Sequence, residues 1–513
     1  MKFMKILVVF IICAAVTIFA ACSEGGSNAN TNQDNNGDNI QAGENNGENP
    51  EDGAETADPR QLVSDDLPDM DLNGYVFRIY THNYAAGGHA DYVLDYYPES
   101  QNGEIIHDSV YMRNRTVEER FNCSIVTVDS GADVSITDHS QKVKRSIVAG
   151  EDTFDIALEH CIYGSNLSLE GLFLNLNAVD HFNFDKPWWY KNTNEEMTVM
   201  GQMYMGSNAI FYSGIAQTWA LYVNKDLVAD LGLTMPYQDV FDGTWTIDKL
   251  IAMTKDVYTD VNGDGARDGG DIYGYAALSV ESNFFSSLDM PILEKTENGV
   301  EIVVNNPRTF SVIEKLYDWF YTTQGCNTPT YGVLIDGMEV YPYVHWAFSN
   351  KKALVVSGMI GDAINHYRSA DVQYGLIPYP KYDESQKDYK SFANDEFFVI
   401  PNTAPDPSRT GLIIEAMAAE GYKQIYPAYY EIALKNKYLH DDESVRILDI
   451  IVNSRNISFA YVYDNWQGYG HMLNDLFNKN PTKDFASFYE KRLGSAQRRI
   501  DLINKSFEEN IQY

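Results

Sequence analysis

Tyr75–Thr81 reads YVFRIYT, Ile105–Phe121 reads IIHDSVYMRNRTVEERF and residues 123–128 read CSIVTV, and these three stretches decide the fold. The first and third are rich in β-branched and aromatic residues and predict strands, whereas the second has the apolar spacing of an amphipathic helix. Residues 137–148 and 154–158 continue the order with a second helix and a third strand. Strands that alternate with helices predict an α/β fold with right-handed crossovers and a parallel sheet covered on both faces.

The same alternation begins again after about residue 220 and predicts a second lobe. Residues 248–256 are predicted to be helical, and residues 353–357 (ALVVS) and 375–378 (GLIP) are predicted strands. A chain of 513 residues also exceeds the roughly 250 to 300 residues at which one hydrophobic core stops growing. No joint rich in Pro, Gly and Ser separates the two halves, so we expect the chain to pass between the lobes more than once.

The first residues predict export and a lipid anchor. Two lysines precede a short apolar run at residues 6–19, and Ala20-Ala21-Cys22 follows, which is the order of a signal peptide and its cleavage site. A cysteine after two alanines is similar to the bacterial lipobox. Residues 1–21 are therefore interpreted as the signal peptide and Cys22 as the lipidated residue that holds the protein at the extracytoplasmic face of the cell membrane. The alternative is a plain secretory signal that is cut near Ala21.

Residues 22–66 are interpreted as the lipidated cysteine followed by a disordered, acidic tether. The segment consists largely of Asn, Gly, Glu, Asp and Ser, with very few large apolar side chains to bury. The whole chain is acidic as well, with a net charge of −35, so it lacks a general cationic surface for phosphates. Nucleic acid is therefore excluded as an expected partner, and we expect a monomer.

Three cysteines remain in the predicted folded part, Cys123, Cys161 and Cys326. Their number is odd and their spacing is that of no disulfide framework or CxxC motif, so we interpret them as buried thiols. One disulfide among the three stays open as an alternative.

Five segments give the chain a resemblance to a known family. They are residues 155–158 (DIAL), 218–227 (TWALYVNKDL), 243–246 (GTWT), 348–358 (FSNKKALVVSG) and 374–380 (YGLIPYP). In this order they resemble the extracellular solute-binding proteins of ABC importers, of the carbohydrate type that includes maltose-binding proteins. The resemblance covers residues 67–513.

The resemblance implies a two-lobed, type II periplasmic-binding-protein-like fold with hinge crossings. The N-lobe would comprise residues 67–216 and 395–435, and the C-lobe residues 217–394 and 436–513. The lobes would close on a solute, in the first place an oligosaccharide, and deliver it to the permease subunits of an ABC transporter. Ile360 stands where maltose-binding relatives have a stacking tryptophan, which argues against maltodextrin as the solute.

Sugar recognition needs flat apolar faces beside planar polar groups, and such groups are expected where strands end. Each candidate could instead simply pack or face solvent, and Trp188, with Trp189, could equally pack within a lobe. The candidate ligand-binding residues are Asn83, Tyr84, Glu159, Trp188, Gln217, Trp219, Asp395 and Trp466.

A second motif resembles a calcium-binding loop of the EF-hand type. Oxygen ligands fall at positions 1, 3, 5, 9 and 12, the carbonyl of Ala266 would supply position 7, and Gly265 at position 6 permits the sharp turn. The alternative is a polar surface turn without an ion. The predicted Ca²⁺ ligands are Asp260, Asn262, Asp264, Ala266, Asp268 and Asp271.

Motifs of catalysis are absent from the sequence, since it contains no GxSxG, HExxH or P-loop pattern. We therefore expect a binding protein and not an enzyme. Three alternatives stay open: a glycoside hydrolase, which needs only two suitably spaced carboxylates, a receptor for a peptide or another polar solute, and a surface adhesin that binds a glycan without a permease partner.

Overall fold

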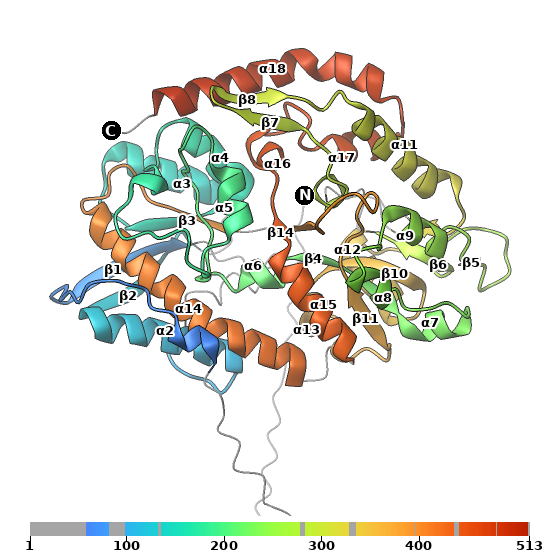
Figure 1. Ribbon diagram of the computed structural model, residues 1–513, viewed down its shortest axis with the longest axis horizontal. Helices are drawn as coiled ribbons and strands as arrows, with labels where there is room; N and C mark the ends of the chain where they lie inside the picture. Colours follow the sequence, from blue (N-terminus) through green and yellow to red (C-terminus); the bar gives the residue numbers. More distant parts are fainter. Residues whose placement is uncertain are drawn as a thin grey trace, which may run out of the picture. The chain divides into compact units, whose positions relative to one another are not determined.

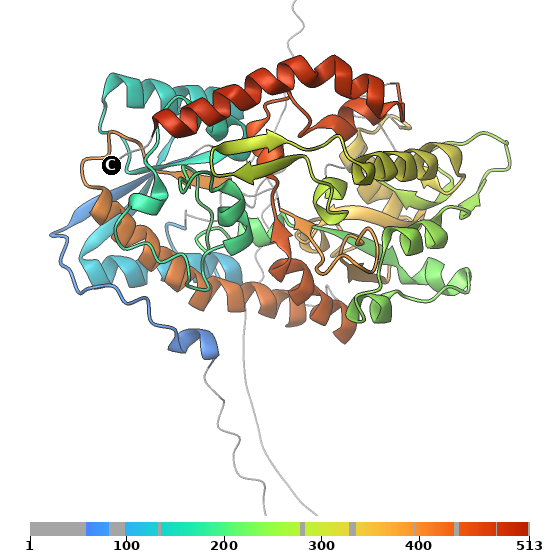
Figure 2. The same ribbon diagram turned by 45° about the horizontal axis from the view of Figure 1, so that its top comes forward.

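Figure 1 shows the computed structural model, which describes residues 58–81, 98–131, 135–277, 283–327, 335–393, 396–435, 441–478 and 480–510. These residues all belong to one compact unit, Asp58–Tyr513. The predicted signal peptide, Cys22 and the first part of the predicted tether lie outside the described residues. Two separate β-sheets, each covered by helices, organise the unit (Figures 1 and 2).

The first sheet has the strand order β13-β3-β1-β2. Its strands are β1 (Tyr75–Thr81), β2 (Cys123–Asp129), β3 (Ile156–His160) and β13 (Glu396–Val399). The strand β1 pairs in parallel with both β2 and β3, whereas β13 pairs antiparallel with β3. The predicted parallel arrangement of the first three strands is confirmed, and a distant part of the chain adds the edge strand β13.

Helices cover both faces of this sheet. The helix α2 (Ile105–Phe121) packs on β2 and on the long helix α14 (Pro407–Lys435), while α3 (Ile136–Ala149) and α4 (Cys161–Leu169) pack on β3. These two pairs of helices lie on opposite sides of the sheet in Figure 1. Because α2 presents Val110, Val117 and Phe121 at the helical spacing that the sequence predicts, these side chains are buried.

The second sheet has the order β11-β4-β10-β6-β5, and β9 also pairs with β6. Its central strand β10 runs parallel to β6 but antiparallel to β4, so this sheet is mixed where a parallel sheet was expected. Every residue from Ala353 to Gly358 is buried, which explains why this strand is a continuous apolar run. Its strands are β4 (Trp219–Asn224), β5 (Tyr258–Thr259), β6 (Ile272–Ala276), β9 (Cys326–Asn327), β10 (Ala353–Met359) and β11 (Tyr374–Ile377).

Two short strand pairs and further helices complete the described unit. The strand pairs are β7 (Leu293–Thr296) with β8 (Gly299–Ile302), and β12 (Ser391–Phe392) with β14 (Arg455–Asn456). The remaining helices are η1 (Pro59–Leu62), η3 (Leu176–Ala178), α5 (Lys191–Met197), α6 (Ser213–Ala216), α7 (Lys225–Asp230), α8 (Tyr237–Phe241), α9 (Ile247–Thr254), α10 (Asn283–Ser287), α11 (Pro307–Thr322), α12 (Val340–Ser349), α13 (Asp362–Asn365), α15 (Asp442–Asn453), α16 (Phe459–Tyr463), α17 (Met472–Phe477) and α18 (Phe485–Glu509).

The tether ends earlier than predicted, because residues 58–66 belong to the compact unit. Asp65 forms an ion pair with Arg120 of α2 at 2.5 Å, and Asp66 forms one with Lys186 at 2.6 Å. The side chain of Gln61 also donates a hydrogen bond to the backbone carbonyl of Lys423 in α14. Acidic side chains among the last nine residues of the predicted tether therefore pair with basic side chains of the compact unit.

The C-terminal segment joins both sheets, and this differs from the predicted C-lobe of residues 436–513. The helix α15 packs on β11 of the second sheet, but α16 and α18 both pack on α4 of the first. Ser165 of α4 donates a hydrogen bond to the carbonyl of Val462, and Arg499 donates one to Asn166. The chain thus returns to the first sheet after α15, a step that no local sequence pattern marks.

The three cysteines of the folded part are free and buried, which confirms their interpretation as thiols. Burial raises the pKa of the Cys123 thiol to about 11, so it stays protonated. In the part of the chain that the structure describes, no helix is both long and apolar enough to cross a membrane.

Candidate functional site

Three chain segments meet where the two sheets are joined. The backbone N–H of Ile360 donates to the carbonyl of Thr218 at 2.9 Å, and that of Gly361 donates to Ala216 at 2.7 Å. Thr218 also forms an antiparallel bridge with Ala393, which lies just before β13 of the first sheet. The crossing between the sheets is therefore built from residues 216–218, 360–361 and 393, and we call it the crossing segment.

Two predicted ligand residues belong to this crossing segment or adjoin it. Gln217 ends α6 and is buried, with its backbone N–H donating to Ser213 at 2.8 Å. Trp219 begins β4, pairs in register with Met359 at the end of β10, and keeps only 8% of its surface exposed. Both residues are buried, so neither offers a broad surface to a ligand in this conformation, and their role in binding stays a prediction.

Among the described candidates, Trp466 has an accessible ring, since 47% of its surface is exposed. Its indole stacks on His471 with ring centroids 4.5 Å apart and an angle of 18° between the planes. His471 in turn packs on Tyr461, whose ring contacts Phe392 edge-on. Phe392 immediately precedes Ala393, so this aromatic chain connects Trp466 to the crossing segment.

The backbone of Trp466 is in the left-handed region, with φ at +57°, directly after Asn465 at +48°. Such a conformation is costly for a bulky side chain and persists only where neighbours enforce it. Arg492 donates one hydrogen bond to the carbonyl of Trp466 at 2.8 Å and another to that of Gly468. Burial also lowers the pKa of His471 to about 4, which keeps the ring beneath the indole neutral.

Glu159 is buried beneath helices. The strand β3 extends to His160 because Glu396 and Phe397 of β13 pair with its end, so Glu159 lies in the sheet and not in the predicted loop. Its carboxylate accepts a hydrogen bond from Ser140 of α3, and Oε1 has no partner among the described residues. Burial raises the pKa of Glu159 to about 8 against the effect of Ser140, and the carboxylate of Glu396 adds to this rise.

Trp188 packs within the first lobe, the alternative that the sequence left open. Its indole N–H and that of Trp189 donate to the two carboxylate oxygens of Glu415 in α14, at 2.9 and 3.0 Å. Burial raises the pKa of Glu415 to about 7, opposed by these hydrogen bonds. Since both indoles are buried, Trp188 has no free face for a ligand in this structure.

The predicted calcium loop has the expected turn. The carboxylate of Asp260 accepts hydrogen bonds from the backbone N–H groups of Gly263 at 2.7 Å and Gly265 at 2.8 Å. Both glycines have φ above +70°, which other residues rarely adopt. Asn262 and Asp264 accept from the backbone N–H groups two residues further on, so their side chains lie on the same tight turn.

Asp271, the predicted ligand at position 12, is engaged within the loop. Its carboxylate accepts hydrogen bonds from the hydroxyl of Tyr258 at 2.9 Å and from the backbone N–H groups of Val261 and Asp268. Where the structure describes the chain, the aspartates of this loop do not form a group of three whose oxygens all lie within 4.8 Å of one another. The turn therefore fits a calcium loop, while the carboxylates are not gathered around one point.

Asn83, Tyr84 and Asp395 lie outside the described residues. The described residues also form a cavity of about 390 Å³ that the sequence did not predict and that none of the described candidate ligand residues lines. Phe285 and Phe459 form apolar walls, and the ion pairs Lys295–Glu196 and Lys390–Asp289 lie at its edge. Its volume suits a small ligand, but its walls come from separate segments without a shared motif.

Two helix-covered α/β sheets joined by a crossing segment define the fold of two-lobed solute-binding proteins, and comparison with solved structures agrees. Mycobacterium tuberculosis UspC matches with a TM-score of 0.50 at 12% sequence identity, over 84% of this chain and 100% of UspC. The sequence matches no protein-family model and no curated protein.

Two further structures match with slightly lower scores. The maltose/maltodextrin-binding domain MalE from Bdellovibrio bacteriovorus, bound to maltotriose, has a TM-score of 0.49 at 13% identity, over 83% of this chain and 100% of that domain. An ABC transporter solute-binding protein from Thermotoga lettingae, bound with alpha-D-tagatose, has a TM-score of 0.49 at 13% identity, over 84% of this chain and 100% of its own. Identities this low describe a likeness of fold.

Proposed function

We propose that this chain is an extracellular solute-binding lipoprotein that captures a carbohydrate, in the first place an oligosaccharide, and delivers it to an ABC permease. The observation that carries the proposal is Trp466, a half-exposed indole on a left-handed backbone that connects through Tyr461 to the crossing segment. A flat, fixed aromatic face is the group that stacks on the C–H surface of a pyranose. The two-lobed fold that UspC shares supports capture by closure of the lobes.

The hydrolase alternative needs two carboxylates that reach a glycosidic bond. Glu159 is buried and mostly protonated at neutral pH, which makes it unsuited to that role in this conformation. The receptor is therefore proposed to bind its solute without turnover, and a peptide or another polar solute stays the alternative ligand.

A thermal-shift screen of the full chain against a glycan panel tests this function, with each mixture analysed for cleavage products. Ligand at a hundred times its Kd stabilises the folded state by about 2.7 kcal/mol, a readable rise in melting temperature. A rise without products supports a carbohydrate receptor, and products support the hydrolase. A panel without any shift, combined with a shift by peptides, would overturn the choice of carbohydrate.

The variant Trp466→Ala locates the site once a ligand is known. We expect a Kd at least about tenfold weaker, a loss of about 1.4 kcal/mol, because the stacking face is removed. Trp346→Ala is the matched control, since Trp346 of α12 is only partly buried and belongs neither to the crossing segment nor to the aromatic chain of Trp466. If Lys390→Ala weakens binding while Trp466→Ala does not, the ligand occupies the cavity beside Phe285 and not the crossing segment.

The lipid anchor at Cys22 is part of the proposal. The run of Ala20-Ala21-Cys22 after an apolar segment supports it. Cys22→Ser should move the protein from the membrane fraction to the medium or periplasm, whereas Cys123→Ser should leave it at the membrane. Retention of Cys22→Ser at the membrane would contradict lipidation at this cysteine.

We also propose that the loop of residues 260–271 binds a structural Ca²⁺ ion. The two glycines in the left-handed region and the turn around Asp260 support this. Asp260, Asn262, Asp264, Asp268 and the carbonyl of Ala266 would hold the ion, and hard oxygen ligands of this kind suit Ca²⁺. Asp271 would have to exchange its present hydrogen bonds for the ion.

A further inference from the structure

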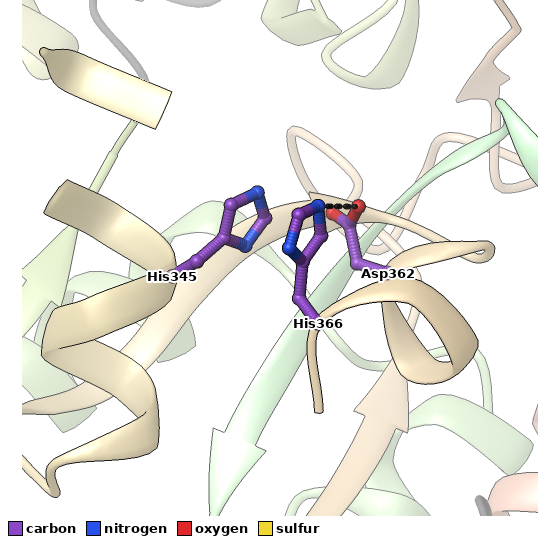
Figure 3. Close-up of side chains that lie close together, drawn as sticks. All are labelled: His345, Asp362 and His366. Atoms are coloured by element: carbon purple, nitrogen blue, oxygen red, sulfur yellow. Dashed lines mark ion pairs between the residues drawn. The ribbon is translucent and has the colours of Figure 1, made fainter. Parts of the chain in front are cut away.

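A cluster of two histidines and one aspartate lies beside the crossing segment (Figure 3). His345 comes from α12, while Asp362 begins α13 and His366 follows its end. One potential ligand atom from each residue lies within 4.8 Å of the other two. Because Gly361, next to Asp362, donates to Ala216 of the crossing segment, the cluster is continuous with the join of the two sheets.

Two of the three side chains are already fixed in place. The Oδ2 atom of Asp362 accepts a hydrogen bond from the backbone N–H of Met359 at 2.7 Å, and its Oδ1 atom faces Nε2 of His366. The Nδ1 atom of His345 is hydrogen-bonded to the buried hydroxyl of Tyr367 at 3.0 Å. In the tautomer in which Nδ1 donates, Nε2 of His345 keeps a free lone pair, and metal-bound histidines are commonly held by such a partner.

The third side chain can move. The side chain of His366 is 44% exposed, and its Nε2 lies 3.8 Å from Oδ1 of Asp362. Two ligand atoms on one tetrahedral Zn²⁺ ion, each about 2.0–2.1 Å from the metal, are about 3.3 Å apart. The rings of His345 and His366 are stacked, with their centroids 3.7 Å apart and an angle of 12° between their planes. The nitrogen lone pairs lie in these nearly parallel planes and do not point at a common position. The exposed ring of His366 must therefore rotate before both nitrogens can bind one ion.

We propose that His345, Asp362 and His366 form a binding site for one divalent transition-metal ion of the zinc type. Two imidazole nitrogens and one carboxylate oxygen are a ligand set that Zn²⁺ accepts and that Ca²⁺ and Mg²⁺ avoid. Three protein ligands leave a fourth position for water or for a group of a bound molecule. The site is independent of the proposed solute specificity, because it uses none of the predicted ligand residues.

The test is equilibrium dialysis of the tag-free full chain against Zn²⁺ alone after treatment with a chelator, with the bound metal measured by mass spectrometry. We expect one Zn²⁺ per chain at this site and a melting temperature that rises with Zn²⁺. In His366→Ala the Kd should weaken by more than about tenfold, since even lost outer-shell partners of metal sites cost 10- to 100-fold. His366 is half exposed, so its replacement leaves the fold intact.

His107→Ala is the matched control, because His107 also lies beside a carboxylate, 3.5 Å from Asp108, but forms no group of three potential ligands with the residues that the structure describes. Its zinc affinity should equal that of the unaltered chain. Co²⁺ adds a second readout, since its visible absorption reports a tetrahedral site and should vanish in His366→Ala. The proposal is overturned if the unaltered chain binds no Zn²⁺, or if His366→Ala binds it with the same stoichiometry and affinity.

Discussion

Replacing the buried Glu159 by glutamine should make the protein more stable at alkaline pH. Glu159 is enclosed by α3 and α4, with Ser140 as hydrogen-bond donor and Glu396 nearby. Glutamine has nearly the same shape and keeps an oxygen for the hydroxyl of Ser140. The substitution removes the ionisable carboxyl group, so the side chain at position 159 stays neutral at every pH.

The sign and size of the effect follow from the pKa. Burial raises the pKa of Glu159 from its ordinary value of 4.5 to about 8 in the folded protein. Between these values the unfolded chain has lost the proton while the folded chain retains it, so the free energy of unfolding falls as the pH rises. The full rise corresponds to about 5 kcal/mol, an upper bound because the helices relax and admit water around a charged group.

Urea unfolding of both proteins at pH 5, 6, 7 and 8 measures this effect. The difference between Glu159→Gln and the unaltered chain should grow with pH in favour of the variant, by several kcal/mol at pH 8. Glu119→Gln is the control, since it makes the same substitution at a side chain that is 73% exposed in α2. A difference that does not change with pH, or one that shrinks as the pH rises, would refute the reasoning.

Two further predictions concern the loop of residues 260–271 and the helix α14. Ca²⁺ should raise the melting temperature of the chelator-treated chain, and Asp260→Ala should abolish the rise because this residue anchors the turn; equal melting in Ca²⁺ and chelator would contradict the calcium site. Gly421→Ala should lower the free energy of unfolding by about 1–3 kcal/mol, since its new Cβ would lie 2.1 Å from the carbonyl oxygen of Ala209. The control is Gly494→Ala in α18, where a Cβ meets no atom closer than 3.7 Å, so it should be neutral or stabilising by up to about 1 kcal/mol. A similar decrease in the free energy of unfolding in both variants would exclude the contact with Ala209 as the cause.

The local pattern of apolar residues was sufficient to predict the bounds of those strands and helices that pack against nearby parts of the sequence. Tyr75–Thr81 and Ile105–Phe121 have the bounds that the sequence predicts, because alternation and helical spacing are set by which face each element buries. The end of β3 was predicted too early. Its last residues are held in the sheet by β13, whose strand comes from a distant part of the chain.

In the candidate site, too, local sequence predicted some features, whereas others depend on contacts between distant parts of the chain. Residue chemistry singled out Trp466 as a candidate stacking ring; its ring is half exposed, and its role in binding stays a prediction. The burial of Trp188 depends on Glu415 in α14, a partner that no spacing in the sequence indicates. The cluster at His345 was missed because its ligands lie on two helices with the strand β10 between them, and no motif links them.

The last helix, α18, connects the hairpin of β7 and β8 to the helix α4 on the first sheet. The side chain of Asn504 in α18 pairs with both the N–H and the carbonyl of Val300 in β8, at 2.8 and 3.0 Å. Five residues earlier in the same helix, Arg499 donates a hydrogen bond to the side-chain oxygen of Asn166 in α4. The helix α18 is thus hydrogen-bonded to the hairpin of β7 and β8 at Asn504 and to the helix α4 at Arg499. In the proposed capture by closure, any movement of the β7–β8 hairpin relative to α4 would have to pivot about α18 or break one of these contacts, so we expect substitutions at Asn504 to change solute affinity.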